Sequence, residues 1–228
     1  MNILRRKKSS QGCMVVIGTD VEALSHALLP QAQNHKMALY QVSHSQQHAT
    51  LQNTLRMNKL DHIHCVKANL FDPKAVARLF KKIKQAGHFI ELVVFQPRAP
   101  ATMASADLTP EYMQQRWQDV GLSAINIAQN TIKHMLPRQQ GKFIVLGSVH
   151  ATEPDSGWLA DGALHAGNRA LLQSLAREFQ PQGIHSCYIA LPHDYTVNSQ
   201  TVHAIAQTCW HVYQQPRSAW SQELSLWK

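Results

Sequence analysis

The stretch Cys13-Met-Val-Val-Ile17 decides the fold, because a run of apolar residues before a turn is typical of a strand buried on both faces. A helical stretch follows from Val21 to about Gln33, and a second strand is expected from Met37 to Val42. A strand, a helix and a strand in this order predict two parallel strands joined by a right-handed crossover.

The same alternation continues along the chain. Strands are expected at 63–67, 91–95, 142–146, 184–191 and 223–227, and helices at 45–57, after Asp72-Pro73, from Thr109-Pro110 to Met135, at 158–179 and at 202–213. Two of these helices begin with a capping side chain followed by proline, a strong start signal. The pattern predicts a doubly wound α/β fold with about seven parallel strands and helices on both faces.

Length and composition fit a single domain. The chain has 228 residues, 44% hydrophobic and 16% charged, which is enough apolar material for one core and excludes global disorder. We expect a domain over 13–228, preceded by a basic flexible tail over 1–12. No apolar run reaches the length of a membrane span, and no apolar segment follows the basic cluster at 5–8, so a secretory signal is not expected.

The net charge, the cysteines and the histidines do not point to a nucleic-acid, disulfide-bonded or metal-binding protein. Half of the net charge of +8 comes from the basic cluster, and no basic stripe with aromatic residues follows, so nucleic acid is not an expected partner. The four cysteines form no close pair, which predicts free thiols and a cytoplasmic protein. The 14 histidines include His44 with His48 and His62 with His64, but nothing makes three ligands converge, so no metal is expected.

A doubly wound sheet binds its ligand at the carboxyl ends of its strands. In this chain those ends are 18–22, 42–44, Asn69, 95–98, Ser148 and 191–194.

Several motifs give the chain a resemblance to the short-chain dehydrogenase/reductase family. Leu70-Phe-Asp-Pro73 resembles the family's D-V-T-D-P after the third strand, and Gly147-Ser148 resembles the S-S that ends the fifth. Ser174-Leu-Ala-Arg-Glu178 with Gln182-Gly-Ile184 is similar to S-L-A-x-E…x-G-I. The resemblance implies a Rossmann-type domain, an NAD(P) cofactor and oxidoreductase chemistry.

The cofactor motif departs from the family pattern. Where the family has T-G-x-x-x-G-x-G after the first strand, this chain keeps Gly18 but has Glu22 and Leu24 at the other two glycines. A carboxylate about 4 Å from a pyrophosphate costs roughly 1 kcal/mol in water and about 4 kcal/mol at an effective dielectric near 20. Leu24 adds bulk where the backbone must approach the phosphates. We therefore expect no NAD(P) binding, or only weak binding.

The other cofactor positions point the same way. No acidic residue or arginine follows the second strand to hold the ribose. Asn69 takes the place of the family's adenine-contacting aspartate; its amide could still accept from adenine, although such an asparagine is more often a turn residue. Phe95-Gln-Pro-Arg98 replaces N-N-A-G, which puts the long side chain of Arg98 where glycine makes room for the cofactor.

One of the family's four catalytic residues is present. Ser148 matches the serine that orients the substrate oxygen, whereas Asp161 falls on the tyrosine, His165 on the lysine and Gly121 on the asparagine of the long helix. A free aspartate is ionised at neutral pH and has no proton to donate in a reduction. His165 is too short to perform both tasks of the lysine.

Two alternatives use the remaining residues. Asp161 and His165 are four apart on a helix and share a face, so with Ser148 they suggest a Ser-His-Asp arrangement, although no nucleophile elbow supports hydrolysis. The short segment from His193 to Thr201 leaves the cleft open to water, which suits a binding surface better than hydride transfer.

Two classes of function remain. The first is a catalytically impaired or altered member of the family that serves as a binding or assembly module, and the departures favour it. The second is an active NAD(P)-dependent oxidoreductase acting on an unknown carbonyl or alcohol with an unusual site. We also expect a homodimer or tetramer formed through the helices at 109–136 and 158–180, because small residues such as Ala163, Ala166 and Ala170 permit close helix approach.

Overall fold

The computed structural model describes residues 11–18, 21–43, 63–192 and 198–226. Within them, seven strands form one parallel sheet in the order β3-β2-β1-β4-β5-β6-β7. The strands are β1 (Gln11–Gly18), β2 (Ala38–Ser43), β3 (Ile63–Lys67), β4 (His88–Gln96), β5 (Gly141–Ser148), β6 (Ile184–Leu191) and β7 (Glu223–Ser225). The predicted doubly wound parallel sheet is confirmed.

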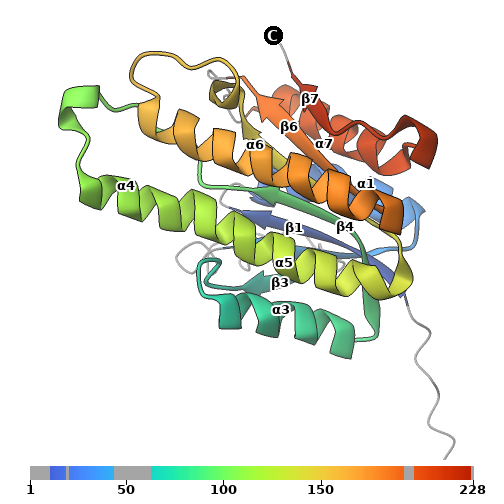
Figure 1. The fold of residues 1–228 in the computed structure, drawn as a ribbon. Helices are drawn as coiled ribbons and strands as arrows, with labels where there is room; N and C mark the ends of the chain where they lie inside the picture. Colours follow the sequence, from blue (N-terminus) through green and yellow to red (C-terminus); the bar gives the residue numbers. More distant parts are fainter. Residues whose placement is uncertain (1–10, 19–20, 44–62, 193–197, 227–228) are drawn as a thin grey trace, which may run out of the picture.

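Helices cover both faces of the sheet (Figure 1). They are α1 (Val21–Asn34), α3 (Pro73–Gln85), α4 (Pro110–Arg116), α5 (Ser123–Met135), α6 (Leu159–Phe179) and α7 (Ser199–Gln214). One face carries α3, α4, α5 and α6, and the other carries α1 and α7. None of the helices in the described ranges combines the length and the apolar character that a membrane span requires.

The sheet divides the core into two layers because successive strand residues point to opposite faces. Val15 and Val93 pack toward the helices α3, α5 and α6, whereas Met14, Leu92 and Val94 pack toward α1 and α7. All these side chains are fully buried. The continuous apolar runs of the sequence thus reflect strands covered on both sides.

The predicted helix starts are also confirmed. The Asp72 carboxylate accepts from the backbone N–H of Lys74 at 2.9 Å, and the Thr109 hydroxyl accepts from that of Tyr112 at 3.2 Å. In each case proline takes the first helical position, whose N–H needs no intrahelical partner.

The long helix predicted from Thr109 to Met135 contains a π turn at Trp117–Leu122, between α4 and α5. We expected Trp117 to pack on the sheet with Ile125 and Ile132, but its side chain is 42% exposed and Ile125 is only half-buried. The wider π turn changes the angular position of residues before it relative to those after it. The expectation was wrong for Trp117, because it assumed one helical period throughout, whereas Ile132 is 7% exposed and packs in the core as expected.

Some boundaries differ from the expected ones. β1 begins at Gln11, inside the predicted tail, and β7 ends at Ser225 rather than at residue 227. The predicted helix at 45–57, the tail at 1–10 and the start of the segment from His193 lie outside the described residues, as do His44, His48 and His62. All four cysteines are free thiols, and three of them are buried.

Candidate functional site

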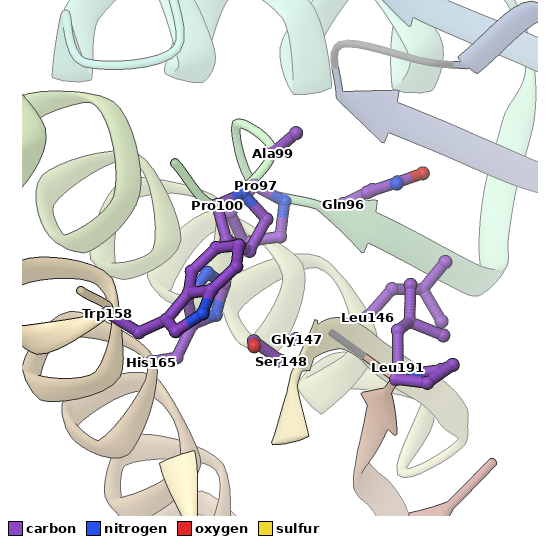
Figure 2. A pocket seen from close by; sticks show the side chains of 11 residues that line it. Gln96, Pro97, Ala99, Pro100, Leu146, Gly147, Ser148, Trp158, His165 and Leu191 are labelled. Carbon is purple, nitrogen blue, oxygen red and sulfur yellow. The ribbon is translucent and has the colours of Figure 1, made fainter. Parts of the chain in front are cut away.

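A small pocket of about 90 Å³ lies at the carboxyl ends of β4, β5 and β6. Figure 2 shows Trp158 and His165 together on the α6 side of this pocket, with Leu146 and Leu191 on the opposite side. Ser148 lies between them, and Gln96, Pro97 and Pro100 complete much of the wall. The walls are therefore mainly apolar, with a hydroxyl, an amide and an imidazole as polar groups.

Ser148, which the resemblance predicts to match the family's catalytic serine, ends β5 and lines the pocket. Its side-chain oxygen accepts a hydrogen bond from the backbone N–H of His150 at 3.2 Å. Its own hydroxyl proton can still be donated to a ligand.

Tyr188, which sequence reasoning did not single out, fixes the backbone of Ser148 through two hydrogen bonds. The Tyr188 hydroxyl accepts from the Ser148 N–H at 2.9 Å and donates to the Ser148 carbonyl at 3.0 Å. Gly147 makes room for it, since a Cβ atom there would lie 2.0 Å from that hydroxyl. Burial raises the pKa of Tyr188, and its proton already has an acceptor, so Tyr188 is a structural residue rather than a replacement proton donor.

Asp161, which the resemblance predicts at the position of the family's tyrosine, is fully buried in an ion pair with Arg116. Its second carboxylate oxygen accepts from the backbone N–H of Ala101 at 2.9 Å, and Arg116 also donates to the carbonyl of Ala99 at 3.1 Å. The pair thus joins α4 to α6 and fixes the loop after β4. Asp161 is not among the residues that line the pocket.

The suggested Ser-His-Asp arrangement is wrong. Both carboxylate oxygens of Asp161 are engaged by Arg116 and Ala101, and neither ring nitrogen of His165 has a hydrogen-bond partner within the described part of the chain. The shared helix face brings the two side chains near each other, but the buried guanidinium is the stronger partner for the carboxylate. Asp161 therefore does not orient His165 as a base for Ser148.

His165, which the resemblance predicts at the position of the family's lysine, lines the pocket and is 2% exposed. Burial lowers its pKa to about 4, an effect that the charge of Arg116 reinforces and that of Asp161 opposes. The imidazole is neutral at physiological pH, so one ring nitrogen can donate and the other can accept. A neutral imidazole cannot supply the positive charge that lowers the pKa of a neighbouring acid.

Gly121, which the resemblance predicts at the position of the family's asparagine, lies in the π turn beneath Trp117. A Cβ atom at Gly121 would lie 2.3 Å from the indole ring, so no larger side chain fits without displacing it. The adjacent carbonyl of Val120 accepts from the side-chain amide of Asn168 at 3.3 Å. This position therefore serves packing between the π turn and α6.

The two expected cofactor residues have structural roles. A Cβ atom at Gly18 would lie 2.2 Å from the Gln96 carbonyl, so this glycine is required by the close approach of β1 and β4. The Asn69 side chain accepts from the backbone N–H of Phe71 at 3.2 Å, which is a local turn. Neither observation requires a nucleotide.

The structure also shows where the residues lie that were expected to hinder cofactor binding. Glu22 lies in the first turn of α1, and the side chain of Leu24 is 3% exposed within the core beneath that helix. The Arg98 guanidinium pairs with Asp119 at 2.7 Å and does not line the pocket. The expected blocking of a cofactor by Arg98 thus remains a prediction.

Sequence reasoning missed Arg116, Trp158 and Tyr188. Arg116 and Asp161 are 45 positions apart, and neither periodicity nor a local motif connects them. An arginine on an amphipathic helix is normally exposed, whereas the Arg116 residue is only 4% exposed. In the part of the chain that the structure describes, no three His, Cys, Asp or Glu side chains gather where they could hold a metal ion.

The sheet order and a pocket at its carboxyl edge define a Rossmann-like α/β protein. The family model for short chain dehydrogenases matches residues 14–206, so the chain belongs to the short-chain dehydrogenase family. This family typically binds NAD(P) and includes oxidoreductases. No curated protein matches the chain closely enough in sequence to be reported as a relative.

Solved structures share the fold across nearly the whole chain. A short-chain dehydrogenase from Rhodopseudomonas palustris is 20% identical, with a TM-score of 0.80 and coverage of 95% of this chain and 98% of that chain. One from Vibrio parahaemolyticus is 15% identical, with a TM-score of 0.75 and coverage of 93% and 98%. An alcohol dehydrogenase from Thermococcus sibiricus, complexed with 5-hydroxy-NADP, is 13% identical, with a TM-score of 0.77 and coverage of 95% and 96%.

Proposed function

We propose that this short-chain dehydrogenase is a catalytically impaired member that acts as a binding module. The observation that carries the proposal is the buried pair of Asp161 with Arg116. The residue at the position of the proton donor has both oxygens engaged away from the pocket, so it cannot exchange a proton with a ligand there. His165 supplies no positive charge to replace the lysine.

The ligand that suits the pocket is small and mainly apolar, with one hydrogen-bonding group. Apolar contacts would come from Pro97, Trp158 and Leu191, while the Ser148 hydroxyl and the neutral imidazole of His165 would fix its orientation. His165 supports this role because it is buried and lacks a partner for either ring nitrogen among the described residues, and such groups are normally satisfied.

NAD(P) is a poor fit to this chain's own residues. A dinucleotide pyrophosphate is held by the N-terminus of the helix after β1, where this chain carries the carboxylate of Glu22. The side-chain amide oxygen of Asn69, which would have to meet the adenine, already accepts from the backbone N–H of Phe71. We expect dissociation constants above roughly 100 μM for NAD, NADH, NADP and NADPH, or about −5.5 kcal/mol.

The alternative is an active NAD(P)-dependent oxidoreductase with an unusual site. It is favoured by Ser148, which lines the pocket with its hydroxyl proton free to orient a carbonyl oxygen. It needs a proton donor other than Asp161, and the neutral imidazole of His165 is the only ring in the described pocket wall that could carry that proton.

Calorimetric titration with the four cofactors, followed by absorbance assays with a panel of carbonyl compounds, tests both proposals. Binding weaker than about 100 μM and no turnover above a Ser148→Ala control are expected. The double variant Asp161→Tyr with His165→Lys should also be inactive, because rebuilding the acid does not rebuild the cofactor site. Turnover by the wild type would support the alternative, and turnover by the double variant would contradict the expected weak cofactor binding.

A further inference from the structure

A second pocket, of about 200 Å³, lies at the opposite end of the sheet. It lies where β4 begins and where α3 and α5 end, and Figure 1 shows these two helices side by side on one face of the sheet. β4 has nine residues, so at about 3.3 Å per residue the two pockets are separated by roughly 26 Å. The side chains that define this basic pocket are Lys84, His88, Phe89, Lys133, His134 and Arg138.

The pocket is strongly positive. Lys84, Lys133 and Arg138 supply three cations, and no carboxylate is among its lining residues. Within the described ranges, none of these three cations forms an ion pair with Asp or Glu. Three unneutralised charges around one cavity favour an anionic ligand with more than one negative charge.

The charges of Lys84 and Lys133 both act on the imidazole of His134. Burial lowers the pKa of His134, and the charges of Lys84 and Lys133 lower it further, against the opposing effect of a hydrogen bond to the Asn130 backbone. The two lysines come from different helices, α3 and α5, yet both act on this imidazole. A bound anion would reverse their effect on His134.

A cation–π contact and a hydrogen bond orient two side chains of the pocket. The guanidinium carbon of Arg138 lies 3.7 Å from the centre of the Phe89 ring, which restricts the arginine without using its N–H groups. His134 Nδ1 lies 2.8 Å from the Asn130 carbonyl, to which it must donate. Its other nitrogen, Nε2, is therefore the one that can donate to an anion when the ring is protonated.

Helix electrostatics explain only part of this cluster. Lys84 and Lys133 lie in the last turns of α3 and α5, where cations are favourable beside the carbonyl ends of a helix. That effect accounts for each lysine alone. It accounts neither for the cavity between them nor for Arg138, which follows α5 and stacks on the strand β4.

We propose that the basic pocket binds a small phosphomonoester, with its phosphate among Lys84, Lys133 and Arg138 and its organic part against Phe89 and Pro137. Arginine and lysine are the side chains that recognise phosphate oxygens, through paired N–H donors and through point charge respectively. The ring of Phe89 and the ring of Pro137, which also line the cavity, suit a carbon skeleton rather than a second charge. This site is independent of the pocket at Ser148.

The test uses phenyl phosphate as the probe and the full chain as the protein. Calorimetry should show saturable binding, and NMR titration of the His134 imidazole should show a rise of its pKa with the ligand present, because the protonated ring gains an anionic partner. Lys133→Gln and Arg138→Gln should each weaken binding at least about tenfold. Lys81→Gln, an exposed lysine of α3 outside the pocket, should leave it unchanged.

A parallel titration with inorganic phosphate separates the phosphomonoester from the free ion. Weaker binding of inorganic phosphate than of phenyl phosphate supports the proposal. Equal affinities for the two would overturn it, because the organic part would then contribute nothing. No saturable binding of phenyl phosphate, or equal binding by Arg138→Gln and wild type, would also overturn it. Lys133→Gln and Arg138→Gln both replace exposed side chains, so a loss of phosphate binding in these variants would not reflect a loss of the fold.

Discussion

The buried pair of Arg116 and Asp161 should make a large contribution to stability that depends on both partners. Their side chains are 5% and 0% exposed. Replacing Asp161 by Leu leaves a buried guanidinium whose remaining hydrogen-bond partner among the described residues is the Ala99 carbonyl. Breaking such a pair from one side costs about 3–5 kcal/mol, a large fraction of the 5–15 kcal/mol typical of a folded domain.

The change in the free energy of unfolding is measurable by urea denaturation followed by tryptophan fluorescence. Thermal denaturation gives a second readout. For a chain of this size each kcal/mol moves the melting temperature by about 2–4 °C, so Asp161→Leu should lower the melting temperature by roughly 6–20 °C. The double variant Arg116→Met with Asp161→Leu should lose less than either single variant, about 1–3 kcal/mol, since it leaves no unpaired buried charge.

The pair of Arg98 with Asp119 provides a matched control. It has the same chemistry, but the Arg98 side chain is 59% exposed. Arg98→Met should therefore cost less than about 1 kcal/mol. Two results would refute the reasoning. One is a loss of unfolding free energy for Asp161→Leu no larger than that for Arg98→Met. The other is a loss for the double variant equal to the sum of the losses for Arg116→Met and Asp161→Leu alone, which would show that the buried pair is not coupled.

Three further predictions concern stability and assembly. The pKa of His165 falls from 6.5 to about 4 on folding, so the unfolded chain binds more protons between these two pH values. The free energy of unfolding should therefore fall as the pH drops from about 6.5 to 4. In urea titrations His165→Gln should reduce this pH dependence, while the exposed His203→Gln should not. Gly147→Ala should cost about 1–3 kcal/mol in urea denaturation, because its methyl group would overlap the Tyr188 hydroxyl, and an unchanged midpoint would contradict this packing. We propose a homodimer or tetramer through the helices at 109–136 and 158–180. Light scattering should give two or four times 25.7 kDa for the wild type and one chain for Gly167→Glu, whose side chain has open space within one protomer. A single-chain mass for the wild type at tens of micromolar would exclude the dimer.

Most of the fold was predictable from the sequence, because strands and helices have local causes. The apolar run at 13–17 predicted β1, and Asp72-Pro73 and Thr109-Pro110 predicted the starts of α3 and α4. The π turn at Trp117–Leu122 was not predictable, since its local sequence fits an ordinary helix. Its packing of Trp117 against Gly121 became evident only in three dimensions.

The sequence by itself determined the parallel sheet and its helical layers, since these follow from hydrophobic period and capping. The departure from the family's usual residues at 161 and 165 stays a prediction from the resemblance. Only the tertiary structure decided what Asp161 does. Its partner Arg116 is 45 positions away and meets it because α4 and α6 pack on the same face of the sheet. A carboxylate removed from water takes the nearest cation and donors, and their positions are set by packing rather than by sequence spacing.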